Sequence, residues 1–211
     1  MSTTPKWTWP VAALLCSVAI ALAALPAHAT GVSPQIALAP ASRLVLHGKS
    51  TLHDFASTAT RLQIAVDLAD SLPAGPPTLA RLAEPGAVRS IVLTIPVEAM
   101  KSEKDGLDKN MYKALKAASN PNIVFRLLSP AVAKGDGGFH LTGDLEVAGV
   151  RQPVEMDVRA SQTPDGIVLE GSKALLMSDY GIKPPKMFLG TLKTDDRIVV
   201  EWRLVLTHAG F

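Results

Sequence analysis

Large apolar side chains occupy every second position near the end of this chain, and this alternation constrains its fold more than any other feature. They are Ile198, Val200, Trp202, Leu204 and Leu206. A period of two places such side chains on one face of a β-strand, whereas an α-helix repeats every ~3.6 residues. The run therefore predicts a strand with one buried face.

The same period recurs along most of the chain. It predicts strands near residues 42–47, 53–67, 88–98, 122–129, 138–147, 153–160, 166–175 and 195–207. The run at 53–67 is long enough to contain a bend or a bulge. Turn sequences at 135–138 and 164–166, and the short link at Gly149, predict antiparallel neighbours. About eight such strands predict a mainly β fold, built as a closed barrel or a sandwich.

One segment breaks the alternation and predicts a short amphipathic helix over 106–118. Its apolar residues are spaced by four: Leu107, Met111 and Leu115. Asp105 or Ser102 is the predicted N-cap, and Asn120-Pro121 is the predicted stop.

Two further segments show neither period. Residues 69–87 are rich in proline and contain at most one helical turn near 79–82. Residues 177–194 include Gly181-Ile182-Lys183-Pro184-Pro185, which cannot form a central strand because proline lacks the backbone N–H. Both segments are predicted as loops.

The first 29 residues have the pattern of a secretory signal peptide. Lys6 precedes an uncharged apolar run from 11 to 25, and Ala27-His28-Ala29 is a small-x-small cleavage site. Cleavage after Ala29 would leave one domain, residues 30–211, in the periplasm. The alternatives are a membrane anchor, for which the run is short, and a lipoprotein signal at Cys16.

Composition excludes several kinds of site. Cys16 is the only cysteine, so the cleaved chain would have no disulfide, thiolate zinc site or iron–sulfur cluster. The formal net charge of +2 gives no electrostatic argument for nucleic acid, which requires a strongly basic face. We predict no cofactor and no nucleic-acid partner.

Five sequence segments, taken together and in this order along the chain, resemble one known protein family. They are Ile95-Pro96-Val97-Glu98-Ala99-Met100-Lys101-Ser102, Lys109-Asn110-Met111-Tyr112-Lys113-Ala114-Leu115, Asn120-Pro121-Asn122-Ile123-Val124-Phe125, Leu141-Thr142-Gly143-Asp144-Leu145-Glu146-Val147-Ala148-Gly149-Val150 and Asp179-Tyr180-Gly181-Ile182-Lys183-Pro184-Pro185. The chain thus resembles the YceI-like family of periplasmic isoprenoid-binding proteins over nearly all of 42–207. The segment Ser50-Thr51-Leu52-His53-Asp54-Phe55 stands where members of the family usually carry a different histidine-containing segment. This difference points to a distinct subgroup.

The resemblance implies a lipocalin-like antiparallel β-barrel of about eight strands, with one short amphipathic helix near its mouth. It also implies a binding or carrier protein for an amphiphilic lipid such as a polyisoprenoid or quinone, held inside the barrel. An eight-stranded barrel is just wide enough for one slender ligand.

We expect the ligand to be bound mainly by inward-facing apolar side chains, unless these fill a dry core. The expected set is Leu62, Ile64, Val66, Leu93, Ile95, Phe125, Leu145, Val158 and Trp202. Met111 and Leu115 would close the mouth, because methionine adapts to varied chains.

Two polar residues are further candidates for ligand binding. His53, beside Asp54, would carry a proton or donate to a headgroup, or else have a structural role at the start of a bent strand. Tyr180 would offer its hydroxyl to a ligand at the barrel end, or else anchor a loop.

A cluster of lysines in and before the helix would contact a phosphate headgroup or transiently an anionic bilayer, or simply be solvated. They are Lys101, Lys104, Lys109, Lys113 and Lys116, with Lys183 and Lys186 in the proline loop.

No catalytic set and no metal-ligand spacing is present, including among His47, His140 and His208. We therefore predict a binding protein and not an enzyme. An isomerase or hydrolase acting on an isoprenoid-like lipid, and a ligand-free stress or scaffold protein, stay open. An outer-membrane barrel fits poorly, because aromatic residues make up only 5% of the chain. Oligomeric state, including a homodimer, is undetermined.

Overall fold

The computed structural model describes residues 36–69, 77–129, 132–134, 137–187 and 192–208. These residues belong to a compact unit that spans Val32–Phe211. The predicted signal peptide and residues 135–136 of the first predicted turn lie outside the described residues. No helix in the described ranges is long and apolar enough to cross a membrane.

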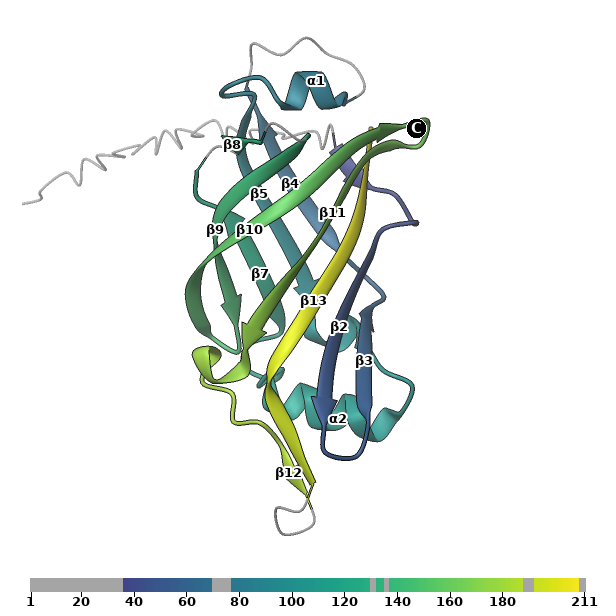
Figure 1. The fold of residues 1–211 in the computed structure, drawn as a ribbon, viewed down its shortest axis with the longest axis vertical. Helices are drawn as coiled ribbons and strands as arrows, with labels where there is room; N and C mark the ends of the chain where they lie inside the picture. The colour runs from purple at the N-terminus through teal and green to yellow at the C-terminus, as the bar shows by residue number, and fades with distance from the viewer. Residues whose placement is uncertain (1–35, 70–76, 130–131, 135–136, 188–191, 209–211) are drawn as a thin grey trace, which may run out of the picture. The chain divides into compact units, whose positions relative to one another are not determined.

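In the part of the chain that the structure describes, thirteen strands form one antiparallel sheet, which confirms the predicted mainly β fold (Figure 1). They are β1 (Ile36–Leu38), β2 (Arg43–Ser50), β3 (Asp54–Ala59), β4 (Gln63–Leu68), β5 (Val88–Pro96), β6 (Met100–Lys101), β7 (Asn122–Leu127), β8 (Val132–Ala133), β9 (Gly138–Val147), β10 (Val150–Thr163), β11 (Gly166–Leu176), β12 (Lys186–Met187) and β13 (Leu192–His208). The main order is β4-β5-β7-β9-β10-β11-β13-β2-β3-β6.

The sheet closes into a barrel through two bent runs that pair with each other. The run predicted at 53–67 is broken into β3 and β4, and the 3-10 turn Val97–Ala99 separates β5 from β6. β4 pairs with β5 at one end of the strand order, and β3 pairs with β6 at the other. Because β3 continues into β4 and β5 into β6, the two ends of the order meet along the same pair of bent runs.

The predicted short turns join neighbouring strands. Ala148 and Gly149 both have positive φ, 52° and 81°, between β9 and β10. Positive φ at both central positions is the geometry of a type I′ hairpin. The turn at 164–165 follows the Thr163–Gly166 pair that ends the β10–β11 ladder.

Helix α2 spans Asp105–Ala114, four residues less at its end than predicted. Lys116 adopts the left-handed conformation, φ 52°, and ends the helix before Asn120-Pro121. The predicted caps were wrong, because Lys104 is the N-cap and makes no side-chain hydrogen bond. Helix α1, Leu79–Leu82, confirms the single predicted turn in the proline-rich segment.

The shortest strands were missed by the sequence analysis. β1, β6, β8 and β12 contain two or three residues each, too few to show a period. β13 also begins at Leu192 inside the segment predicted as a loop, where β12 pairs with it. These elements are defined by their partner strands and not by their own pattern.

The buried apolar residues form separate clusters instead of one filled centre. Ile36, Ile167 and Leu206 pack together at one end of the barrel, with Leu79 and Leu82 of α1 against them. A second cluster joins α2 to the turn after β11 and consists of Val97, Leu115, Val147, Ala148, Tyr180 and Ile182. The interior between these clusters is available for a cavity.

Candidate functional site

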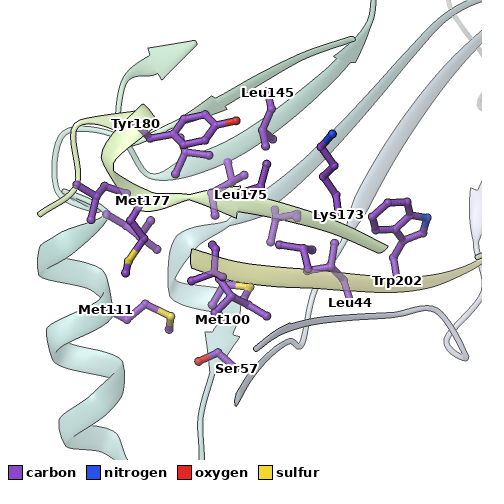
Figure 2. Close-up of a pocket in the computed structure, with 18 of the residues that line it drawn as sticks. Leu44, Ser57, Met100, Met111, Leu145, Lys173, Leu175, Met177, Tyr180 and Trp202 are labelled. Atoms are coloured by element: carbon purple, nitrogen blue, oxygen red, sulfur yellow. The ribbon is translucent and has the colours of Figure 1, made fainter. Parts of the chain in front are cut away.

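A cavity of about 410 Å³ lies inside the barrel (Figure 2). Alternate strand positions form its wall, so that the whole alternating run of β13, from Ile198 to Leu206, faces it. A volume in this range suits a ligand of drug size or a slender chain. The predicted alternation is therefore confirmed as an inward-facing surface, and the interior is hollow.

The cavity wall contains all the predicted ligand-binding residues except Leu62 and Val66. The predicted residues in the wall are His53, Ile64, Leu93, Ile95, Met111, Leu115, Phe125, Leu145, Val158, Tyr180 and Trp202. Leu62, in the break between β3 and β4, packs against the Leu44–Met100 cluster. Val66 packs into the cluster that fills the far end of the barrel. Contact of the wall with a ligand stays a prediction.

Helix α2 lies beside the mouth, as expected. Its apolar stripe Leu107, Met111 and Leu115 contributes to the cavity wall. The tip of the β2–β3 hairpin forms another part of the rim, where Leu52 is 70% exposed although it also lines the cavity. Leu52 thus extends the apolar surface of the cavity to the outside of the barrel.

Two aromatic side chains of the cavity wall lie opposite glycines on the neighbouring strand. Gly171 pairs directly with Trp202, and Gly48 with Phe55. A Cβ atom on either glycine would overlap the opposing ring. Each ring therefore lies against the backbone of the neighbouring strand at a position that has no side chain. The ring thus stays close to the barrel wall. This glycine–aromatic pairing also stabilises strand register.

His53 lies at the mouth, and its backbone has the structural role. The Ser50 hydroxyl donates to the His53 carbonyl at 2.8 Å, and the His53 N–H donates to the Ser50 hydroxyl at 3.3 Å. Among the described residues, no hydrogen bond or ion pair joins the imidazole to Asp54. The imidazole is exposed and faces the opening.

Tyr180 anchors a loop and also lines the cavity. Its ring is buried with Ile182 and Leu115. Burial raises the pKa of its hydroxyl to about 12, with a smaller contribution from Asp179. The hydroxyl therefore stays protonated at neutral pH.

Acidic side chains pair with basic ones on the outer surface. Glu146 contacts Arg151 at 3.0 Å and Arg126 at 3.1 Å, and its hydrogen bond from Arg151 is the largest cause of its lowered pKa. Asp157 contacts Lys134 and His140, and Lys134 is the main cause of its lowered pKa. Within the described ranges, no Asp or Glu lines the cavity, and no group of three His, Cys, Asp or Glu could hold a metal ion.

The sequence analysis missed several polar residues of the wall, which are Ser50, Ser57, Asn110, Lys173, Lys193 and Thr194. Lys173 occupies an inward position of β11, two residues from Leu175 and four from Leu169. The same period of two could have found it, since a lysine in phase with apolar residues faces the same side as they do.

Comparison with known families identifies the fold. The family model of the YceI-like domain matches residues 45–206. The chain belongs to the YceI-like family. No curated protein matches it.

Solved structures share the YceI-like fold at low sequence identity. BcnA of Burkholderia cenocepacia is 16% identical, with a TM-score of 0.62, over 78% of this chain and 95% of that one. A polyisoprenoid binding domain from Saccharophagus degradans is 11% identical, with a TM-score of 0.59, over 83% and 99%. The Campylobacter jejuni YCEI protein is 15% identical, with a TM-score of 0.54, over 74% and 85%. These similarities confirm the fold.

Proposed function

We propose that this protein is exported to the periplasm and carries an amphiphilic lipid, such as a polyisoprenoid, inside its barrel. The open apolar cavity is the observation that supports this function. Burying apolar surface contributes about 25 cal/mol per Å², so a long hydrocarbon chain would bind tightly with few polar contacts. The polyisoprenoid-binding domain from Saccharophagus degradans, which has a similar fold, also supports a lipid ligand.

The leading alternatives predict different properties. A ligand-free scaffold would have a filled core, whereas this interior is hollow. An enzyme would convert an isoprenoid-like lipid, and assays of purified protein for changed lipid products would detect it.

The first test is native mass spectrometry of protein purified from its own periplasm. We expect an additional mass that organic extraction removes and identifies as a lipid. N-terminal sequencing of the same sample should begin at Thr30 if the signal peptide is cleaved after Ala29. An empty barrel would contradict lipid binding, and an intact leader would contradict export by this route.

A pair of variants on one strand tests where the lipid lies. Leu93 faces the cavity, whereas the adjacent Val92 points to the other face of β5. Leu93→Trp should block the cavity and remove the bound lipid. Val92→Trp adds the same bulk outside and should retain it. Equal binding by both variants would place the lipid elsewhere.

A further inference from the structure

Lys173 projects into the barrel interior from the middle of an apolar row. It pairs with Val200 on β13, which pairs with Leu46 on β2. Directly opposed residues of antiparallel strands share a face, and all three line the cavity. Figure 2 shows the Lys173 ammonium among apolar side chains that include Leu145 and Trp202.

This ammonium has no partner among the residues that the structure describes. Within the described residues, Lys173 forms no hydrogen bond or ion pair, whereas Glu146, Asp157 and Glu170 on the outer surface each pair with a basic side chain. The described part of the cavity wall contains no carboxylate that would approach it. The other lysine of the cavity wall, Lys193, is exposed at the mouth. A charge in apolar surroundings costs free energy unless it is paired.

We propose that Lys173 binds the carboxylate of a long-chain amphiphile held in the cavity. The inference rests on the proposed lipid-binding function and names its ligand class. A carboxylate carries one negative charge and would form a neutral pair with the single ammonium at this depth. A pyrophosphate would bring more charge than Lys173 compensates, and an alcohol would leave the ammonium without a counter-ion.

The position of Lys173 also defines the direction of the ligand. On its mouth side lies the row of Leu175 and Ile198, and polar rim residues follow. On its far side the wall continues with Leu169 and Leu204 toward the closed end. The hydrocarbon tail therefore occupies the inner part of the barrel, and the carboxylate lies one row inside the mouth.

The test uses delipidated protein and three probes with the same chain: hexadecanoate, hexadecanol and hexadecyltrimethylammonium. Hexadecanoate should bind about tenfold tighter than hexadecanol, since a hydrogen bond between two charged groups is stronger than one with a neutral hydroxyl. The ammonium probe should bind most weakly because of like-charge repulsion. Titrations at low and high salt should differ little, because a buried pair is weakly screened.

Three variants test whether Lys173 is the residue that causes the preference for hexadecanoate. Lys173→Met keeps the length of the side chain and should abolish the preference for hexadecanoate without weakening hexadecanol binding. Lys173→Arg keeps the charge and should retain the preference. Lys193→Met removes the exposed lysine at the mouth and should also retain it. Hexadecanol binding by each variant reports that its cavity is folded.

The outcomes separate this inference from the function on which it rests. Equal binding of hexadecanoate and hexadecanol by the unaltered protein would overturn the carboxylate site and leave lipid binding intact. A preference that survives Lys173→Met would overturn the role of Lys173. Failure of the unaltered protein to bind any of the probes or any native lipid would overturn the proposed function itself. Should Lys173→Met fail to fold, the comparison of probes on the unaltered protein still decides.

Discussion

The backbone N–H and the hydroxyl of Ser102 both donate to the same oxygen, Oδ1 of Asp108, at 2.7 Å each. Asp108 is only 4% exposed, and Lys101 lies 3.8 Å from its other oxygen. This carboxylate therefore ties the first turns of α2 to the segment that follows β6. Because α2 forms part of the cavity wall, the same contact holds one side of the mouth in place.

Asp108→Asn should lower the free energy of unfolding by about 1–3 kcal/mol, because two donors lose a charged acceptor. Asp105→Asn, at an exposed position of the same helix, is the matched control and should change it by less than about 0.5 kcal/mol. Urea denaturation measures both. Equal stability of the two variants would show that the contact between Asp108 and Ser102 does not stabilise the fold.

The same carboxylate should make stability depend on acid pH. Burial opposes the charged form of Asp108, but the Ser102 hydrogen bonds and Lys101 bring its pKa below the ordinary value of 3.8. The stabilisation is thus complete above pH ~3.8 and is lost as the pH falls through the lower, folded-state pKa. The stability difference between the unaltered protein and Asp108→Asn should shrink in that acid range. A difference that stays constant would contradict this linkage.

Tyr180 should make stability fall at alkaline pH. Its folded-state pKa of about 12 lies above the ordinary value of 10.0, so the folded state retains the proton more tightly than the unfolded state. The resulting stabilisation is fully present below pH ~10 and is lost as the pH rises toward 12. Denaturation midpoints at neutral and alkaline pH should show this loss in the unaltered protein and less of it in Tyr180→Phe. Identical profiles would mean that burial does not shift this hydroxyl.

Gly171→Ala should destabilise the barrel and disturb its cavity. The added Cβ would overlap the Trp202 ring and lie 2.9 Å from the carbonyl oxygen of Asp157. Overpacking of this kind costs about 1–3 kcal/mol, and displacement of the ring toward the interior should weaken lipid binding. Ser172→Ala, at the outward neighbouring position, is the control. Unchanged binding and stability in Gly171→Ala would show that the ring does not depend on the glycine.

The exposed lysines of α2 should assist transfer of lipid to anionic membranes. Lys109 and Lys113 point away from the apolar stripe and are exposed, as is Lys116 just after the helix. Glutamine substitutions at all three should slow transfer to vesicles that contain anionic lipid and reduce the salt dependence of the rate. Transfer to neutral vesicles should not change. Arg159→Gln, on the outer face of β10, serves as the control, and a salt-independent rate in the unaltered protein would contradict membrane contact.

The alternation of apolar residues was sufficient to predict the longer strands and part of the cavity wall, and the glycine-containing turn sequences predicted the short links. This is because the two faces of a strand are determined locally: Ile198 to Leu206 face one side in any sheet that they join. The spacing of Leu107, Met111 and Leu115 likewise determined the face of α2 that packs inward.

Only the tertiary structure decided that the interior is hollow and that Val66 lies outside the cavity. Whether an inward side chain meets a ligand or another side chain depends on which strands curl together and on what lies opposite. Gly171 and Trp202 are far apart in the sequence, and Gly48 and Phe55 lie on the two strands of the β2–β3 hairpin. Neither residue of a pair shows by itself that the ring packs against a glycine. The local period places Lys173 on the inward face, but only the assembled barrel wall shows that none of the described residues pairs with it.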